Sequence, residues 1–565
     1  MQNKKLPIGI DDFEKLINEG FFYVDKTLMI KSLLSSWSEV NLFTRPRRFG
    51  KSLNLSMLFQ FFDVDSNKAV FDGLNILREK ELVSEHMGKH PVIFLSLKSI
   101  EGETFDSSFN MLKILMRGEV RRIKRKIGEN NLSKEEIEYL SSFIDLSASL
   151  EEYKNVFKGL SEIMSEHYGT KVIILLDEYD VPLDKAYLNG YYDEMVSFLR
   201  GLFGNAFKTN KNLLFAVLTG CMRVSKESIF TGINNLDANT IIDNRHDEYF
   251  GFTEAEVDRI LDFYHIAQRK KDIQEWYDGY RFGHEDIYCP WDVICAVKKL
   301  TADPEAEMQP FWINTSGNDI IRRFINKSDR NTRDEIEKLL AGEVVEKRIN
   351  MELTYRDIDR SIDNLWSVLF VTGYLTVKEK PKNGIYKLSI PNKELRGVFV
   401  SEIKEWFSEE VINEDGLSFE LTQALMEGKQ DRVESLLNDL LSKTISVLDT
   451  NGRRGKKENF YHGILLGIIA GRRNWLCKSN SESGDGFSDI VVYTDNHNQG
   501  IVIEVKYSDS PLNLGADAEQ AINQIEEKNY RARFLSEGIE DILSYGIAFN
   551  KKRCKVLLKE TKKDM

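Results

Sequence analysis

The chain has 565 residues, of which 42% are hydrophobic and 30% are charged, and its formal net charge is −13. This length exceeds what one hydrophobic core holds, so we expect two to four domains of roughly 100 to 200 residues each. The composition excludes a generally disordered chain, and the negative charge excludes a surface that is uniformly basic for nucleic-acid binding.

Targeting and redox signals are weak along the whole sequence. No segment reaches about 18 uninterrupted apolar residues, and the first residues lack the apolar core of a signal peptide. We therefore expect a cytoplasmic protein without a membrane span. The five cysteines are scattered without a CxxC pair, which favours buried reduced thiols over a disulfide framework or a zinc cage. Short basic stretches at 121–126, 453–457 and 551–555 are more often solvated faces than DNA contacts.

The first chemical signal is a loop between a short apolar strand at Val40 and a helix that reaches Phe62. The order strand, loop, helix is what a phosphate-binding loop requires. The loop reads RPRRFGKSL, and its end supplies a glycine, the lysine Lys51 for the β/γ phosphates and the hydroxyl of Ser52 for Mg²⁺. Arg45 stands where the usual pattern has a glycine, so the motif is degenerate and a chance GKS in a basic loop is the alternative.

Three further apolar runs predict strands, at 91–97, 171–177 and 212–220. Helical stretches separate them, which predicts a doubly wound α/β sheet. The second run ends in LLDEYD, where Asp177 would hold Mg²⁺ through water and Glu178 would orient or deprotonate the attacking water. The alternative is a structural strand that ends in acidic residues by chance. The phosphate loop followed by these acids, in this order along the chain, favours a nucleotide site.

The third run leads to Thr219 and Arg223, which we expect at the carboxyl edge of the sheet, where ligands bind in such folds. Arg223 would sense or stabilise the γ-phosphate, with a structural ion pair as an equal alternative. The residues predicted to hold the nucleotide are Arg45, Arg47, Arg48, Phe49, Gly50, Lys51, Ser52, Asp177 and Arg223.

From about Phe252 the pattern becomes mainly helical, with aromatic punctuation. Between Leu365 and Glu405, a helix, two short strands and a second helix resemble a winged-helix unit. A helical hairpin over 419–448 then leads into a final segment with two strands, DIVVY and GIVIEVKY, and a helix from Asp517.

The second chemical signal lies on those two strands. Asp489 enters the first, and Glu504 and Lys506 lie two residues apart on the next, so they project from the same face. An Asp and a Glu can hold Mg²⁺, and a lysine can steady an attacking water or a phosphate. This chemistry is that of phosphodiester cleavage, although two charges on alternate residues are more often a solvent face.

Two predicted helices flank these strands. Glu458 and His462 are one helical turn apart and would reach the metal side. Gln524 and Lys528 would form a polar edge that faces the same site or DNA. The predicted catalytic residues are Glu178, Glu458, Asp489, Glu504 and Lys506, and the predicted metal ligands are Ser52, Asp177, Asp489 and Glu504.

Several sequence blocks in order give a more specific signal than either motif. They include FYVDKTLMI, RPRRFGKSLNLSML, LLDEYDVPL, WYDGYRFG, YCPWDV and YHGILLGII. The chain resembles a bacterial family with an N-terminal AAA-ATPase-like domain and a C-terminal PD-(D/E)XK nuclease domain. The resemblance implies that an arginine-rich loop, including Arg45, replaces the glycine-rich one. It also implies phosphate and Mg²⁺ roles for Lys51 and Ser52, and a nuclease core at Asp489, Glu504 and Lys506 that has Ser488 where the family pattern has proline.

These signals together predict an ATP- and Mg²⁺-using P-loop protein coupled to a nuclease that acts on nucleic acid, with DNA as the expected substrate and defence or mobile-DNA processing as a guess at its role. The alternative is a signal-transducing ATPase switch whose C-terminal domain binds a nucleic acid or a protein without cleavage. We expect domains at 1–250, 251–415 and 416–565 and allow a homo-oligomer. Arg200 is a candidate for action across a subunit boundary, although an ordinary helix arginine is the more frequent case.

Overall fold

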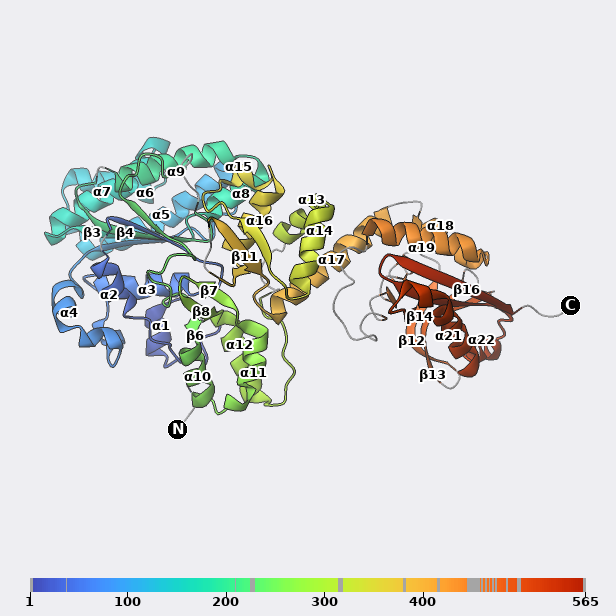
Figure 1. The fold of residues 1–565 in the computed structure, drawn as a ribbon. Helices are drawn as coiled ribbons and strands as arrows, with labels where there is room; N and C mark the ends of the chain where they lie inside the picture. The colour runs from blue at the N-terminus through green and yellow to red at the C-terminus, as the bar shows by residue number, and fades with distance from the viewer. Residues whose placement is uncertain are drawn as a thin grey trace. The chain divides into compact units, whose positions relative to one another are not determined.

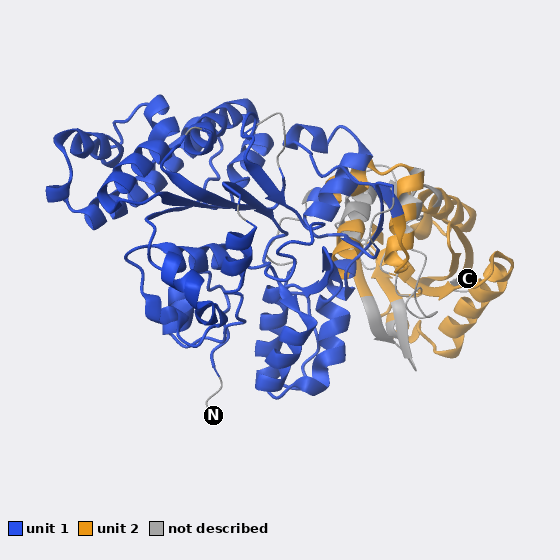
Figure 2. Cartoon of the chain, turned by 60° about the vertical axis from the view of Figure 1, so that its left-hand side comes forward, with its two compact units in different colours: residues 1–320, 346–396 blue, residues 321–345, 397–565 orange. Residues whose placement is uncertain are grey.

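The computed structural model describes residues 4–36, 38–208, 210–223, 229–312, 319–379, 383–413, 417–444, 458, 461–462, 465–466, 468–469, 472, 475–483, 486–494 and 499–561. The chain divides into two compact units, coloured separately in Figure 2. Unit 1 comprises 1–320 and 346–396, and unit 2 comprises 321–345 and 397–565. The domain boundaries expected near 250 and 415 stay predictions. None of the helices in the described ranges combines the length and apolar character needed to cross a membrane.

Unit 1 is built on a five-stranded sheet with the order β2-β3-β4-β1-β5. Its strands are β1 (Val40–Thr44), β2 (Val92–Ser96), β3 (Val172–Asp177), β4 (Leu213–Gly220) and β5 (Leu236–Asn239). All neighbours in this sheet pair in parallel. Every residue of β1 and β3 is buried, because helices cover both faces of the sheet. The predicted doubly wound sheet is confirmed.

Helices lie on both sides of this sheet, with α6, α7 and α9 on one side and α1 and α3 on the other (Figure 1). The sequence marks several helix starts: Ser133 with Glu136, and Ser149 with Glu152, form capping boxes that begin α6 and α7. The helices are α1 (Phe13–Asn18), α2 (Met29–Ser35), α3 (Lys51–Phe62), α4 (Lys80–His86), α5 (Phe105–Ile127), α6 (Lys134–Ile144), α7 (Leu150–Tyr168), α8 (Val181–Asn189) and α9 (Tyr192–Phe207).

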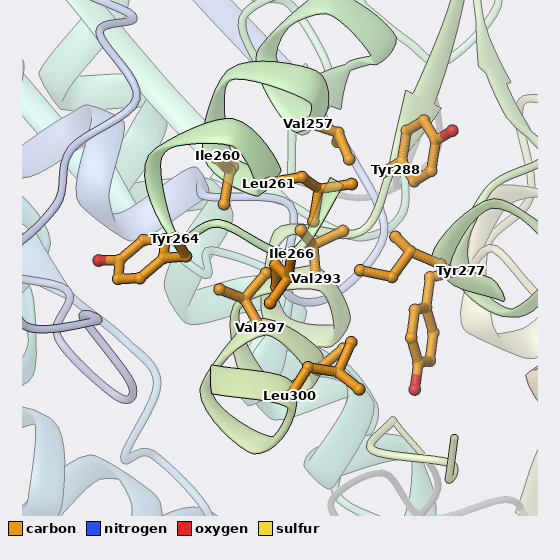
Figure 3. Close-up of a cluster of buried hydrophobic side chains, with 12 residues drawn as sticks. Val257, Ile260, Leu261, Tyr264, Ile266, Tyr277, Tyr288, Val293, Val297 and Leu300 are labelled. Carbon is orange, nitrogen blue, oxygen red and sulfur yellow. The ribbon is translucent and has the colours of Figure 1, made fainter. Parts of the chain in front are cut away.

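The rest of unit 1 is mainly helical, as expected, with one small sheet that the sequence did not indicate. Helices α10 (Glu254–Phe263), α11 (Lys270–Tyr277) and α12 (Pro290–Ala302) enclose an apolar core that includes Ile260, Tyr277 and Val297 (Figure 3). Beside it lies the antiparallel sheet β6-β8-β7. Its strands are β6 (Phe252–Thr253), β7 (Tyr280–Phe282) and β8 (Glu285–Tyr288).

The predicted order of helix, two strands and helix between 365 and 405 is observed. These elements are α16 (Ile362–Val371), β10 (Thr376–Val377), β11 (Ile385–Ser389) and α17 (Lys393–Asn413). They follow β9 (Val345–Arg348) and α15 (Tyr355–Ile358), and the three strands form a sheet with the order β10-β11-β9. The chain passes from unit 1 into unit 2 within α17, between residues 396 and 397.

Unit 2 is built on a second five-stranded sheet, with the order β12-β13-β14-β15-β16. Only β14 and β15 are parallel; the other neighbours are antiparallel. The strands are β12 (Leu476–Ser483), β13 (Gly486–Tyr493), β14 (Gln499–Tyr507), β15 (Asp541–Asn550) and β16 (Arg553–Thr561). The helices are α13 (Asp319–Lys327), α14 (Arg330–Leu340), α18 (Leu417–Met426), α19 (Gln430–Thr444), α21 (Leu514–Glu527) and α22 (Ala532–Ser536).

Helix α21 packs closely on the middle of this sheet. A Cβ atom on Gly546 of β15 would lie 2.4 Å from the carbonyl oxygen of Ala518 in α21. The absence of a side chain therefore allows the helix backbone to approach the strand. In the register of the parallel pair, Gly546 lies opposite Glu504, so this approach brings α21 to the predicted catalytic glutamate.

Candidate active sites

The serine of the phosphate loop and the first acid of LLDEYD are hydrogen-bonded in unit 1. Ser52 Oγ donates to Asp177 Oδ2 at 2.6 Å, and Asp177 Oδ1 accepts from Thr219 Oγ1 at 2.6 Å. Burial, followed by repulsion from Glu178, raises the pKa of Asp177. A hydroxyl and a carboxylate are hard oxygen ligands of the kind that Mg²⁺ prefers. These residues therefore fit the predicted ion.

The lysine of the loop is buried among oxygen atoms. Lys51 Nζ donates to the carbonyl oxygens of Arg45 and Pro46, both at 3.2 Å, and lies 3.4 Å from Glu178 Oε1. Burial opposes its charge, but the neighbouring carboxylates, Glu178 first among them, outweigh burial and raise the pKa of Lys51. The ammonium group therefore stays charged within the phosphate loop, as phosphate binding requires.

Two left-handed backbone conformations flank this lysine. Gly50 has φ 82° and caps α3, the helix that begins at Lys51. Glu178 has φ 53° directly after Asp177, which for a residue with a side chain costs about 1–3 kcal/mol and is most often retained at functional sites. Both residues lie where strand ends and the α3 N-terminus converge, which is the favoured place for an anion in such folds.

Two of the loop arginines differ sharply in their surroundings. Arg45 is fully buried, and its Nη1 donates to the carbonyl oxygens of Thr44 at 2.9 Å and Asn239 at 2.8 Å. Its guanidinium also lies 5.1 Å from the ring centre of Phe250, and burial lowers its pKa to about 10. Arg47, in contrast, is exposed. Arg45 therefore joins the ends of β1 and β5, and its predicted contact with phosphate stays a prediction.

The third arginine and the phenylalanine of the loop are also held by unit 1 itself. Arg48 Nη1 donates to the carbonyl oxygen of Phe311 at 3.2 Å, and its guanidinium lies 4.6 Å from the ring centre of Trp291. Phe49 is fully buried. Among the three arginines, Arg47 is thus the best placed to reach a bound phosphate.

One acid near the first site was missed from the sequence. Asp180 Oδ2 accepts from the backbone N–H groups of Cys221 and Met222, at 2.8 and 2.9 Å, and burial raises its pKa to about 7. It therefore fixes the segment that leads to Arg223, whose guanidinium lies 3.6 Å from Glu352. The last acid of LLDEYD was the available signal. A phosphate-sensing role for Arg223 stays a prediction.

Arg200 is exposed on α9. Its action across a subunit boundary also stays a prediction.

In unit 2, the structure brings together three of the side chains that the sequence singled out. Glu504 of β14 is 2% exposed, and its Oε1 lies 3.2 Å from Lys506 Nζ. Gln524 of α21 donates a hydrogen bond from Nε2 to the same oxygen. Asp489 belongs to β13, directly before Ile490, which pairs with Ile503; the Asp489 side chain lies outside the described residues. Its contact with a metal stays a prediction.

The helix carboxylate predicted for this site approaches the end of β14. Glu458 Oε1 accepts from the backbone N–H of Tyr507 at 3.3 Å. One turn later, the ring of Tyr461 stacks on Phe549 of β15 at 4.4 Å. Glu458 therefore contacts the backbone of the residue that directly follows Lys506 in β14. The roles of His462, and of Lys528, which is exposed beyond the end of α21, stay predictions.

Comparisons with known proteins agree with a nucleotide site in unit 1 and a nuclease-like site in unit 2. Residues 7–230 match a family model described as "Predicted AAA-ATPase", and residues 456–559 match one described as "PD-(D/E)XK nuclease superfamily". The chain is also 25% identical over 557 residues to an Azotobacter chroococcum mcd 1 protein described as "Uncharacterized protein in vnfD 5'region", and the match covers 98% of this chain and 97% of that protein. The two matched regions contain the two sites described above. The chain therefore combines an AAA-ATPase-like domain with a domain of the PD-(D/E)XK nuclease superfamily.

Proposed function

We propose that unit 1 binds and hydrolyses ATP with Mg²⁺, and that unit 2 is a metal-dependent nuclease whose access to DNA depends on the nucleotide. The observation that carries the first half is the hydrogen bond between Ser52 and Asp177 beside the charged ammonium of Lys51. P-loop enzymes use this combination of serine, acid and lysine to hold Mg²⁺ and the β/γ phosphates.

Each residue of the first site has a distinct task in this proposal. Ser52 and Asp177 would hold Mg²⁺, which when bound neutralises charge on the phosphates. Lys51 would exchange its two carbonyl partners for phosphate oxygens. Glu178, 3.4 Å from that ammonium group, would orient or deprotonate the attacking water. Arg47 and Arg223 are the candidates for an additional phosphate contact.

The second half of the proposal rests on the group around Glu504. A buried carboxylate beside Lys506 and Gln524 is suited to hold Mg²⁺, and Asp489 is the second candidate ligand. Bound metal would polarise a phosphodiester. Lys506 would stabilise charge on the phosphate or position water, and Glu458 would support the end of the strand on which Lys506 lies. A role in defence or mobile-DNA processing is the broadest part of the proposal.

The test uses purified full-length protein with linear and circular DNA and with RNA, in Mg²⁺ or Mn²⁺, with and without ATP. Lys51→Ala should abolish phosphate release, whereas Lys31→Ala, which removes an exposed lysine paired with Glu79 at 2.8 Å, should not. Glu504→Ala should abolish cleavage, whereas Glu420→Ala on α18 should not. Undiminished phosphate release by the Lys51 variant would contradict the ATPase assignment.

The nuclease assignment has its own contrary outcome. If no substrate is cut, or if the Glu504 variant cuts as well as the parent protein, unit 2 is not a nuclease. The remaining candidate would then be an ATPase switch whose C-terminal domain binds a nucleic acid or a protein partner without cleavage.

A further inference from the structure

A buried pair of carboxyl groups lies close to the phosphate loop and has no part in the proposed chemistry. Asp292 of α12 and Glu394 of α17 are 1% and 2% exposed, and the Glu394 carboxylate lies close enough to Asp292 to add to the effect of burial in raising the pKa of that group. Glu394 Oε1 also accepts from the backbone N–H groups of Phe311 and Trp312, at 2.5 and 2.6 Å. Apolar residues at such positions often stabilise a fold equally well or better. Stability alone therefore does not explain the pair.

The pair is connected to the loop through Arg48. Phe311, whose N–H donates to Glu394, accepts from Arg48 Nη1 through its carbonyl oxygen at 3.2 Å. The Cys289 thiol, which lies near Asp292, donates a hydrogen bond to the Arg48 carbonyl oxygen at 3.9 Å. Arg48 has φ 71°, in the left-handed region. Both its side chain and its strained main chain are thus held by the carboxyl pair and its neighbours.

The same pair is attached to an element that leaves unit 1. Glu394 lies in the first turn of α17 (Lys393–Asn413), and the chain enters unit 2 after residue 396 of this helix. Hydrogen bonds and rigid elements that connect two regions can carry energetic coupling between them. A change at Arg48 therefore has a short bonded route, through Phe311 and Glu394, to the start of this helix.

We propose that Asp292 and Glu394 are positioning residues that connect the phosphate loop to α17, so that nucleotide binding in unit 1 changes the start of this helix and, through it, the activity of unit 2. The inference rests on the proposed function and specifies the route of the nucleotide effect. Burial raises the pKa of Asp292 well above its ordinary range, and burial also raises that of Glu394 to about 7. Burial therefore favours the protonated form of both carboxyl groups.

The test compares the full-length parent with Glu394→Gln, which keeps an acceptor oxygen for Phe311 and Trp312 but removes the ionisable group. Glu275→Gln is the matched control, because Glu275 bonds Lys393 in the same turn of α17 at 3.2 Å but is exposed. Amide hydrogen exchange at 311–312 and 393–396 is measured with and without ATP and Mg²⁺, together with DNA cleavage and ATP affinity.

We expect ATP to change exchange at these amides in the parent and in the control. The affinity of Glu394→Gln for ATP should stay within about threefold of the parent's. The change that ATP causes in amide exchange and in cleavage should be at least about fivefold smaller in this variant than in the parent, which is the scale of a typical coupling energy. Should Glu394→Gln fail to fold, Asp292→Asn provides the same comparison.

Three results would overturn the inference. A Glu394 variant that responds to ATP as the parent does would exclude the pair from the route. A parent that binds ATP and cuts DNA without a change in exchange at 311–312 and 393–396 would remove the route and leave the proposed function intact. A parent that neither binds ATP nor cuts would remove the proposed function and this inference with it.

Discussion

At the phosphate loop, Lys51 and Ser52 follow Arg45 and Phe49, whose side chains are fully buried in the surrounding protein. In unit 2, by contrast, the candidate catalytic groups Glu504 and Lys506 lie two residues apart on one buried strand. The loop is held by side chains such as Phe49, which is fully buried and packs edge-on against the ring of Tyr280 at 4.9 Å. The strand is held by backbone pairing on both sides, to β13 and β15.

This difference explains why the two motifs differ in their agreement with consensus patterns. A glycine-rich loop wraps a phosphate with backbone N–H groups and has no side chains to anchor. Here Arg45, Arg48 and Phe49 hold the loop in place through side-chain contacts. Substitution in the loop should therefore affect its position, whereas substitution on the strand should affect chemistry without moving the sheet. The predictions below test that distinction.

The largest effect should come from Lys506→Met. Removal of the ammonium group leaves Glu504 buried without its cationic neighbour at 3.2 Å, which disfavours the carboxylate form needed for metal binding. It also removes a charge that, in the proposed function, would stabilise the phosphate in the reaction. We expect cleavage to fall by about 10³-fold while unit 2 remains folded, as measured by nuclease assay and denaturant titration.

Lys559→Met is the control for this prediction, because Lys559 is an ion-paired lysine of the same sheet that lies beside Glu526. It should retain cleavage near the parent level. If Lys506→Met cuts at the parent rate, or if it loses activity only because unit 2 unfolds, the strand does not separate chemistry from structure as we propose.

The second prediction concerns an anchor of the loop. Phe49→Ala should lower the free energy of unfolding of unit 1 by about 3–5 kcal/mol, the usual cost of truncating a buried phenylalanine. It should also weaken ATP binding by about tenfold or more. ATP binding would then have to supply the free energy that holds the loop in place, and each 1.4 kcal/mol spent in this way lowers the affinity tenfold. Denaturant unfolding and ATP titration measure the two effects.

Phe49→Leu is the conservative comparison, because it refills much of the space between Tyr280 and Phe282. It should recover most of the lost free energy of unfolding and most of the lost ATP affinity. Full ATP affinity in the Phe49→Ala variant would show that the loop does not depend on its buried side chains, and the contrast with the strand would disappear.

The strands and the principal site contacts could be predicted from the sequence because local patterns specify them. Continuous apolar runs identified β1, β3 and β4, and alternation placed Glu504 and Lys506 on one face of β14. Parallel strands end at a common edge, so the meeting of Ser52, Asp177 and Thr219 followed from order alone.

Other features depend on contacts between distant segments and left no local signal. Arg45 and Arg48 have the same chemistry in the sequence, and only the positions of Asn239 and Phe311 give them their hydrogen-bond partners. The strands β7 and β8 are three and four residues long, too short for alternation to be distinguished from a loop. Asp292 and Glu394 are 102 positions apart, and nothing in either local pattern predicts that they share a buried site.

The smallest predicted effect concerns pH and the Asp292–Glu394 pair. In the folded protein the pKa of Glu394 is raised from 4.5 to about 7, so between these values the folded state binds more protons than the unfolded state. Its contribution to stability is complete below about pH 4.5 and is lost as pH rises through about 7. Glu394→Gln lacks this ionisable group and should not show this loss. Between pH 5 and pH 8, the free energy of unfolding of unit 1 should therefore decrease more in the parent than in Glu394→Gln, by about 1–3 kcal/mol. Glu275→Gln should follow the parent, because Glu275 is exposed. Equal pH dependence in all three proteins would mean that Glu394 ionises normally in the fold, and the pair would then differ little from the exposed acids around it.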